Sequence, residues 1–268
     1  MKIALCFYGL VGSKADKNGT GIPLDPAIAY KLNNDNLIVN NIKLGHEVDV
    51  FIHSWSHEFK DELVALYQPK ACSIEKQKEF PDANKVANNR DCSERVKMTL
   101  SVAKSPSTFF ELKSKNEKEA FRAYSRWYSN KTVLELKKKY EIENAFEYDC
   151  VMILRLDVGF YEPLNFSSYD MGNFYASNWN DYPTAENNYS TNEKNHNLGK
   201  GFLDFWFFSN SENMNQFSNL YEQITSYHVS PHRASYQHVS SFTDKIKYTK
   251  YRWSDFEMIR RKEFDSVK

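Results

Sequence analysis

The sequence predicts an α/β fold in which helices cover both faces of a mostly parallel central sheet. Apolar runs such as residues 2–8 show almost no alternation, which is typical of strands covered on both faces. Segments with helical spacing of apolar residues alternate with these runs, as in α/β proteins. The length of 268 residues suits one large domain, so we expect a single domain over residues 1–268.

The expected strands are short apolar runs that end at polar or aromatic residues. They cover residues 2–8, 48–53, 71–74, 148–158, 201–209 and 245–252. The expected helices begin after a capping residue or carry an apolar stripe. They start at Pro26 after Asp25, and cover residues 58–67, 117–140 and 211–227, the last with Ser209 or Ser211 as its cap. A short segment over residues 256–260 closes the fold.

Two long polar segments interrupt this order. Residues 75–116 are mixed in charge and predict a polar helical insertion, with one or two surface helices and a loop at Pro106. Residues 178–200 are rich in Asn, Thr, Glu and Lys and predict a long mobile loop. Neither segment contributes strands to the expected sheet.

Charge and hydropathy exclude several classes of protein. Lys and Arg together number 35, and Asp and Glu together number 35, so the formal net charge is zero. A protein that binds nucleic acid through a broad basic face is therefore not expected. Mean hydropathy is −0.67, and no apolar run reaches the roughly 18 residues of a membrane span. The N-terminal apolar run is too short for a signal peptide.

The four cysteines also indicate a compartment. Cys6, Cys72, Cys92 and Cys150 lack metal-ligand spacing, and two of them lie in apolar runs. Cys6 and Cys150 are therefore expected to be buried as small apolar residues. We expect a cytoplasmic protein with no transmembrane segment, and the sequence does not specify its oligomeric state.

Ligands of parallel α/β sheets bind at the carboxyl ends of the strands. That rule selects Gly9–Ser13, His53–Trp55, Arg155–Asp157 and the end of the 202–208 strand. Arg155 and Asp157 are two apart and should project to one side. They either pair with protein groups to hold a loop or form a phosphate or metal site, because a lone buried charge is costly.

Three further groups of polar residues are candidates. Asp204 lies inside an apolar run, which suits either a hydrogen-bonded structural carboxylate or a tuned acid or base. A histidine cluster either binds phosphate, supplies a metal ligand or forms a polar surface turn; its members are His228, His232 and His238. Arg126 and Lys131 either face a ligand from the long helix or lie on its solvated side, the alternative that spacing favours.

Several familiar motifs are missing from the sequence. The segment from Gly9 to Lys14 has neither Walker A nor G-x-G-x-x-G spacing. There is no G-x-S-x-G elbow and no H-E-x-x-H motif. His53 and His57 flank a strand end instead of sharing a helix, so zinc is not expected there.

Eight segments in order resemble small bacterial and viral glycosyltransferases of the capsule or lipopolysaccharide type, which have a GT-A-like (Rossmann-like) fold. These segments span nearly the whole chain: 1–9, 49–55, 125–131, 148–158, 204–209, 219–222, 230–232 and 255–260. The resemblance implies transfer of a sugar from a nucleoside-diphosphate sugar to a glycan acceptor. A surface polysaccharide or a glycoprotein glycan would be the acceptor, and Mn²⁺ or Mg²⁺ the cofactor.

The resemblance also implies roles for individual residues. Asp204 would be the general base of an inverting transfer, and Asp157, at the last position of an Asp-x-Asp motif, the catalytic metal ligand. The first acidic position of that motif is Arg155 here, and a guanidinium there would neutralise diphosphate charge in the metal's place. Substrate-binding roles would fall to Gly9, His53, Trp55, Ser125, Arg126, Lys131, Arg155, His232 and His238, with residues 178–200 as an acceptor lid.

Two other functions compete with this interpretation. The first is another group transferase that acts on surface sugars with a sulfate or phosphoramidate donor. The second is a non-catalytic protein that binds glycans by stacking them on some of its 17 Tyr, 19 Phe and 5 Trp residues. A donor screen distinguishes the three.

Overall fold

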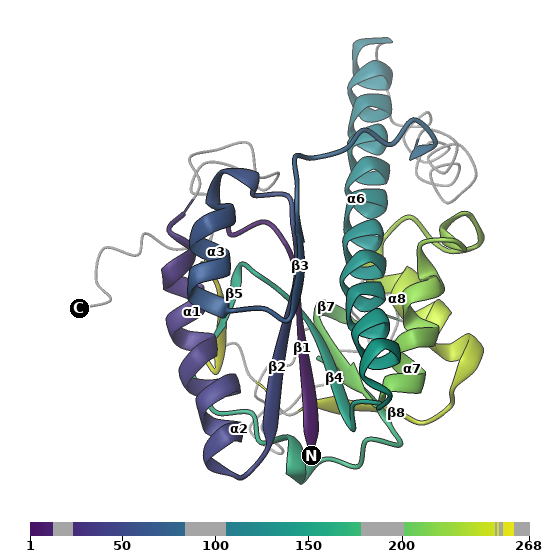
Figure 1. Ribbon diagram of the computed structural model, residues 1–268. Coiled ribbons are helices and arrows are strands. Elements are labelled where there is room, and N and C mark those ends of the chain that lie inside the picture. The colour runs from purple at the N-terminus through teal and green to yellow at the C-terminus, as the bar shows by residue number, and fades with distance from the viewer. Residues whose placement is uncertain (13–23, 84–105, 178–200, 250, 252–253, 260–268) are drawn as a thin grey trace.

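The structure is a computed structural model that describes residues 1–12, 24–83, 106–177, 201–249, 251 and 254–259, with the helix backbone alone for 106–117 (Figure 1). The loop expected over residues 178–200, with its role as a lid, and much of the expected insertion over residues 75–116 lie outside this part.

A seven-stranded sheet forms the centre of the fold (Figure 1), in the order β3-β2-β1-β4-β7-β6-β8. Its strands are β1 (Lys2–Gly9), β2 (Glu47–Ser54), β3 (Ala71–Ile74), β4 (Cys150–Arg155), β6 (Phe174–Ser177), β7 (Leu203–Ser209) and β8 (Ile246–Thr249). All neighbouring pairs are parallel except β4–β7 and β6–β7, so β7 alone is reversed. The prediction of a mostly parallel sheet is confirmed.

Helices cover both faces of this sheet, as predicted (Figure 1). One face carries α1 (Pro26–Asn33), the π-helix η1 (Asn34–Val39), α2 (Asn40–Lys43), the 3₁₀ turn η2 (His57–Phe59) and α3 (Lys60–Tyr67). The other carries α6 (Pro106–Asn144), α7 (Ser211–Phe217), the 3₁₀ turns η4 (Ser218–Leu220) and η5 (Ile224–Ser226), and α8 (Pro231–Phe242). A two-stranded sheet of β5 (Val158–Phe160) and β9 (Phe256–Met258), and the turn η3 (Phe166–Ser168), complete the described elements.

The two covered faces explain why β1 is apolar without alternation. Ile3, Leu5 and Phe7 pack into the core beneath α1 and α3. Ala4 and Cys6, with Tyr8 at the end of the strand, pack into the core beneath α6. Both sets are buried, so every position along the strand favours an apolar side chain. Tyr8 therefore ends the strand under α6.

Several predicted boundaries are wrong, each for a local reason. Pro106 opens α6 and does not lie in a loop, because proline suits the first turn of a helix. Pro231 opens α8 in the same way, where a polar turn was one expectation. The helix expected over residues 211–227 ends at Phe217 and continues as 3₁₀ turns.

Other differences concern a cap and two strands. The cap of α7 is Asn210, whose side chain accepts from the Asn213 amide at 2.9 Å, and not Ser209 or Ser211. The run over residues 148–158 divides into β4 and β5, and β6 was not predicted. The expected strand over residues 245–252 is the shorter β8.

Two buried asparagines fix the chain that follows β4. The Asn33 amide donates to the Val158 carbonyl at 2.8 Å and accepts from the Phe160 amide at 3.2 Å. The Asn41 amide donates in the same way to the Leu164 carbonyl at 2.8 Å. These side chains complete hydrogen bonds that a neighbouring strand would otherwise supply. They hold the segment beginning directly after Asp157.

Two further findings bear on the expected setting of the chain. In the described segments no helix is long and apolar enough to span a membrane. Cys6 and Cys150 are fully buried, as predicted, and they and Cys72 are free thiols.

Candidate functional site

The candidate site lies where the direction of strand order reverses. From β1 the chain adds β2 and β3 on one side and β4 on the other, so the switch point falls between β1 and β4. Ligands of such sheets bind in the crevice at the carboxyl ends of these two strands. Tyr8 and Arg155 are register partners there. Both point toward α6, as the burial pattern of their strands requires.

The reversed strand β7 brings Asp204 to the same edge. Trp206 lies opposite Leu154 in the antiparallel pair, so the first residues of β7 lie beside the last residues of β4. The expectation that the end of the 202–208 strand reaches this edge is therefore wrong, because its start does. Asp204, which lies inside an apolar run of the sequence, is therefore at the edge of the sheet where ligands bind.

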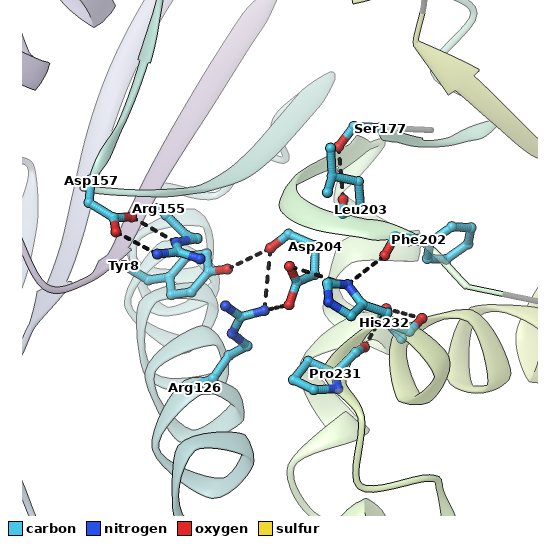
Figure 2. Close-up of polar contacts among 11 residues, drawn as sticks. Tyr8, Arg126, Arg155, Asp157, Ser177, Phe202, Leu203, Asp204, Pro231 and His232 are labelled. Carbon is cyan, nitrogen blue, oxygen red and sulfur yellow. Dashed lines mark hydrogen bonds and ion pairs between the residues drawn. The ribbon is translucent and has the colours of Figure 1, made fainter. Parts of the chain in front are cut away.

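Asp204 is buried, and three elements contact it (Figure 2). Arg126 of α6 forms an ion pair with its Oδ2. His232 of α8 places Nδ1 at 3.4 Å from its Oδ1. The Tyr8 hydroxyl donates to the Asp204 backbone carbonyl at 3.3 Å. Helices α6 and α8 therefore meet at the Asp204 carboxylate, and strand β1 contacts the backbone of the same residue.

His232 is a neutral imidazole in this arrangement. Burial, together with the positive charges of Arg126 and Arg155, lowers the pKa of His232 to about 3. Its contact with Asp204 is therefore a polar contact and not an ion pair. Nδ1 lies 2.9 Å from the Phe202 carbonyl, which can only accept, so Nδ1 carries the proton and Nε2 the lone pair.

Arg155 and Asp157 form a second buried pair at the end of β4, as the predicted common side requires (Figure 2). Nε of Arg155 donates to Oδ1 of Asp157 at 2.7 Å, and Nη2 donates to Oδ2 at 2.5 Å. Burial opposes the charged guanidinium, but the Asp157 carboxylate more than offsets this, and the pKa of Arg155 is raised. A pair between Arg155 and protein groups was one of the two alternatives expected from the sequence. In Figure 2 this pair lies on the same side of the site as Tyr8, near Asp204.

The loop after β1 gives the site a close backbone approach. Gly9 and Gly12 have φ values of 93° and 113°, which favour glycine. Ser54 donates to the Gly9 carbonyl at 2.8 Å and so holds the loop against β2. A Cβ built on Gly9 would meet no heavy atom within 4 Å, so space is open beside this strand end.

His53 and Trp55 belong to a separate polar cluster at the ends of β2 and β3. His53 Nδ1 lies 2.6 Å from Ser129 Oγ, and Nε2 lies 3.3 Å from Glu75 Oε1. Trp55 stacks on Tyr128 of α6, with ring centroids 5.6 Å apart. Burial lowers the pKa of His53 to about 4, so this imidazole is neutral too. The Ser129 side chain is fully buried, so its contact with His53 joins α6 to β2, and Ser129 is not accessible as a nucleophile.

The remaining candidate residues lie outside both clusters or at their margin. Ser125 donates to Gln77 at 3.0 Å, near the His53 cluster. Lys131 forms an ion pair with Glu222 on the flank of α6. His238 contacts the Gln216 carbonyl through Nε2 at 3.0 Å and joins α8 to α7. Lys131 and His238 therefore contact protein groups in this structure, and their binding roles stay predictions.

Sequence reasoning did not single out two residues of the site. Tyr8 was read as part of an apolar strand, and Asn130 as part of a helix. Asn130 is 2% exposed and sits one turn after Arg126. Burial raises the pKa of Tyr8, and the nearby Asn130 amide partly opposes that rise. Its amide Nδ2 and Oδ1 make no hydrogen bond in the part of the chain that is described. A polar residue one turn from Arg126 on the sheet-facing side was the available signal.

The described residues do not fit a metal centre built from side chains. They contain no group of three His, Cys, Asp or Glu side chains that could hold an ion. Both oxygens of Asp157, the expected metal ligand, accept from Arg155. We therefore derive no chemical step through a metal, and Mn²⁺ or Mg²⁺ stays a prediction.

The neutral histidines predict that acid destabilises the fold. The pKa of His53 is about 4 in the folded chain against an ordinary 6.5, so the unfolded chain binds the extra proton between these values. The free energy of unfolding therefore has its full value above about pH 6.5 and falls as the pH approaches 4. His53 alone accounts for a loss of about 3 kcal/mol over this range. Urea unfolding at pH 7, 6 and 5 measures this.

Matched substitutions attribute that pH dependence. His53→Gln should reduce this pH dependence and leave the part due to His232 and His238, whereas the same change at the exposed His57 should leave it as in the unmodified protein. An equal slope in all three proteins would contradict a neutral buried His53.

Comparison with known proteins adds no relative to this geometry: no protein-family model matches the chain, and no curated protein matches it significantly.

Proposed function

We propose that this protein is a glycosyltransferase with a GT-A-like fold. It would move a sugar from a nucleoside-diphosphate sugar to a glycan acceptor, on a surface polysaccharide or a glycoprotein glycan. One observation carries the proposal: Asp204, a buried carboxylate at the strand-order switch point, lies between Arg126 and the neutral His232. Cytoplasm remains the compartment we expect.

The charges at the site suit a diphosphate leaving group. Arg126 and Arg155 reach the same edge of the sheet from α6 and β4 (Figure 2). Guanidinium groups bind phosphate oxygens in a bidentate manner, and they stabilise charge that develops as a phosphate departs. The open space beside Gly9 lets the donor approach the backbone there.

Asp204 is the base of an inverting transfer in this proposal. The acceptor hydroxyl oxygen bonds to the anomeric carbon, and the bond from that carbon to the diphosphate oxygen breaks. The electron pair of the broken bond leaves with the diphosphate, whose charge the arginines balance. The hydroxyl proton passes to Asp204. Arg126 and His232 hold Asp204 in place for this step.

The aromatic residues favour a transferase over a protein that only binds glycans. The largest fully buried side chains are mostly aromatic, among them Trp127 and Trp206. Among the described aromatic residues, Tyr161 and Tyr248 are the exposed ones, at 38% each; Tyr161 follows β5 of the small sheet, and Tyr248 lies on β8 of the central sheet. Aromatic content therefore reflects core packing in this part of the chain, and no exposed stacking platform is formed there.

A ligand screen tests the donor class. The melting temperature is measured with uridine, guanosine, cytidine and adenosine diphosphate sugars, each in EDTA and with Mn²⁺. A ligand at about 100 times its dissociation constant stabilises the native state by roughly 2.7 kcal/mol. We expect one nucleotide class to raise the melting temperature. A shift only with a sulfate or phosphoramidate donor would replace the proposal with the rival transferase.

A further inference from the structure

The Arg155 guanidinium is buried, yet most of its donors are unused. Its side chain is 10% exposed and lies 5.5 Å from the centre of the Phe205 ring. Asp157 takes Nε and one N–H of Nη2, which are two of the five donors of a guanidinium. The remaining three N–H groups, on Nη1 and Nη2, make no hydrogen bond to the described residues. None of the Arg155 nitrogens is among the fully buried atoms without a partner, so the unused N–H groups keep some access to solvent and are available to an acceptor that enters the site.

The unused donors form a fork of defined direction. A side-on pair through Nε and Nη2 leaves the end of the guanidinium, Nη1 and Nη2, to bind a second planar or tetrahedral anion. Tyr8, the register partner of Arg155, and the Arg126–Asp204 pair lie on that side of the cluster (Figure 2). The fork therefore opens toward the proposed donor site.

Hydrogen bonds fix the backbone around Asp157, so that its carboxylate can orient the Arg155 guanidinium. Its backbone carbonyl accepts from the Ile259 amide at 2.9 Å, and Asn33 holds the next residue, Val158, at 2.8 Å. Its side chain is 5% exposed. A carboxylate fixed on both sides, with both oxygens on one guanidinium, limits the rotation of that guanidinium.

We propose that Arg155 is an end-on receptor for the diphosphate of the ligand and that Asp157 is its positioning residue, not a metal ligand. This inference rests on the proposed function only for the identity of the ligand, since the receptor would bind any diphosphate. Among the described residues of the cluster, the two arginines and two aspartates balance in charge while His232 is neutral. The diphosphate therefore binds through directed hydrogen bonds more than through net charge.

Pyrophosphate binding in EDTA, followed by calorimetry, tests the receptor without any sugar. Asp157→Asn and Asp157→Ala remove the same charge, but only asparagine keeps an oxygen that accepts from Arg155. Their difference therefore reports orientation alone. We expect the alanine variant to bind pyrophosphate about tenfold more weakly than the asparagine variant, with the same order after Mn²⁺ is added. Circular dichroism confirms that each variant is folded.

Arg155→Lys is the second variant, because it keeps the charge and removes the fork. We expect it to weaken pyrophosphate binding about tenfold in EDTA. Equal affinity of the two Asp157 variants, or binding by the unmodified protein only with Mn²⁺, would overturn the proposal. Pyrophosphate binding with the expected order but no transfer from any nucleotide sugar would retain the receptor and reject the proposed function.

Discussion

Asp204→Asn is expected to slow sugar transfer by about 10²–10⁴-fold, the range that a positioned general base contributes. The amide keeps the size of the carboxylate and an oxygen that can accept from Arg126, but it cannot take the acceptor proton. Arg126 and His232 contact the side chain of Asp204 and Tyr8 contacts its backbone, so the variant side chain should stay in place. Transfer rates at saturating donor measure the change, and donor affinity should change much less.

A matched control separates this effect from general damage. Asp170 lies in a surface turn, where it accepts from the Gly172 amide at 2.9 Å. Asp170→Asn should leave transfer as in the unmodified protein. A folded Asp204→Asn variant with unchanged turnover would show that Asp204 is only structural, the other alternative that the sequence left open.

Lys137→Ala is expected to destabilise the fold by about 3–5 kcal/mol, because it leaves a buried carboxylate without its cation. Lys137 is fully buried, and its Nζ donates to Glu141 at 2.9 Å, Ser211 at 2.7 Å and Asn215 at 2.9 Å. These bonds join α6 to α7. Burial lowers the pKa of Lys137, and the Glu141 carboxylate partly opposes this shift. Urea unfolding at pH 7 measures the loss.

The same helix supplies the control. Lys139 and Glu143 form the same i, i+4 pair at 3.7 Å, with side chains 74% and 58% exposed. Lys139→Ala should change stability by less than about 0.5 kcal/mol. Lys137 lies eleven residues from Arg126, about 16 Å along α6, so folded Lys137→Ala should keep its turnover. A small loss of stability from both substitutions would contradict the buried network.

The sheet could be predicted because both of its faces are covered. The apolar runs of β1, β4 and β7 show no alternation with polar residues, which is typical of central strands that are buried on both faces. The reversal of β7 could not be predicted, since an apolar run reads the same in either direction. The cap at Asn210 and the helix start at Pro106 were missed because neighbouring residues offered equal local signals.

The site residues could be found one by one but not as a group. Asp204, Arg126 and His232 come from three segments, and only the reversal of β7 and the packing of α8 bring them together. Asn130 was missed because nothing in the helical pattern shows that its amide lies near the Tyr8 hydroxyl at the end of β1. His53 and Trp55 were predicted at the correct end of the sheet, but the sequence did not show that they contact Ser129 and Tyr128 of α6.

Release of nucleoside diphosphate from a panel of nucleotide sugars tests the central claim most directly. The assay compares the unmodified protein with Asp204→Asn, with water and with a mixture of oligosaccharides as acceptors. We predict release from one nucleotide class, faster with a suitable acceptor, and loss of that release in the variant. The claim is contradicted if the folded protein releases nucleoside diphosphate from no donor, or if both proteins release it at the same rate.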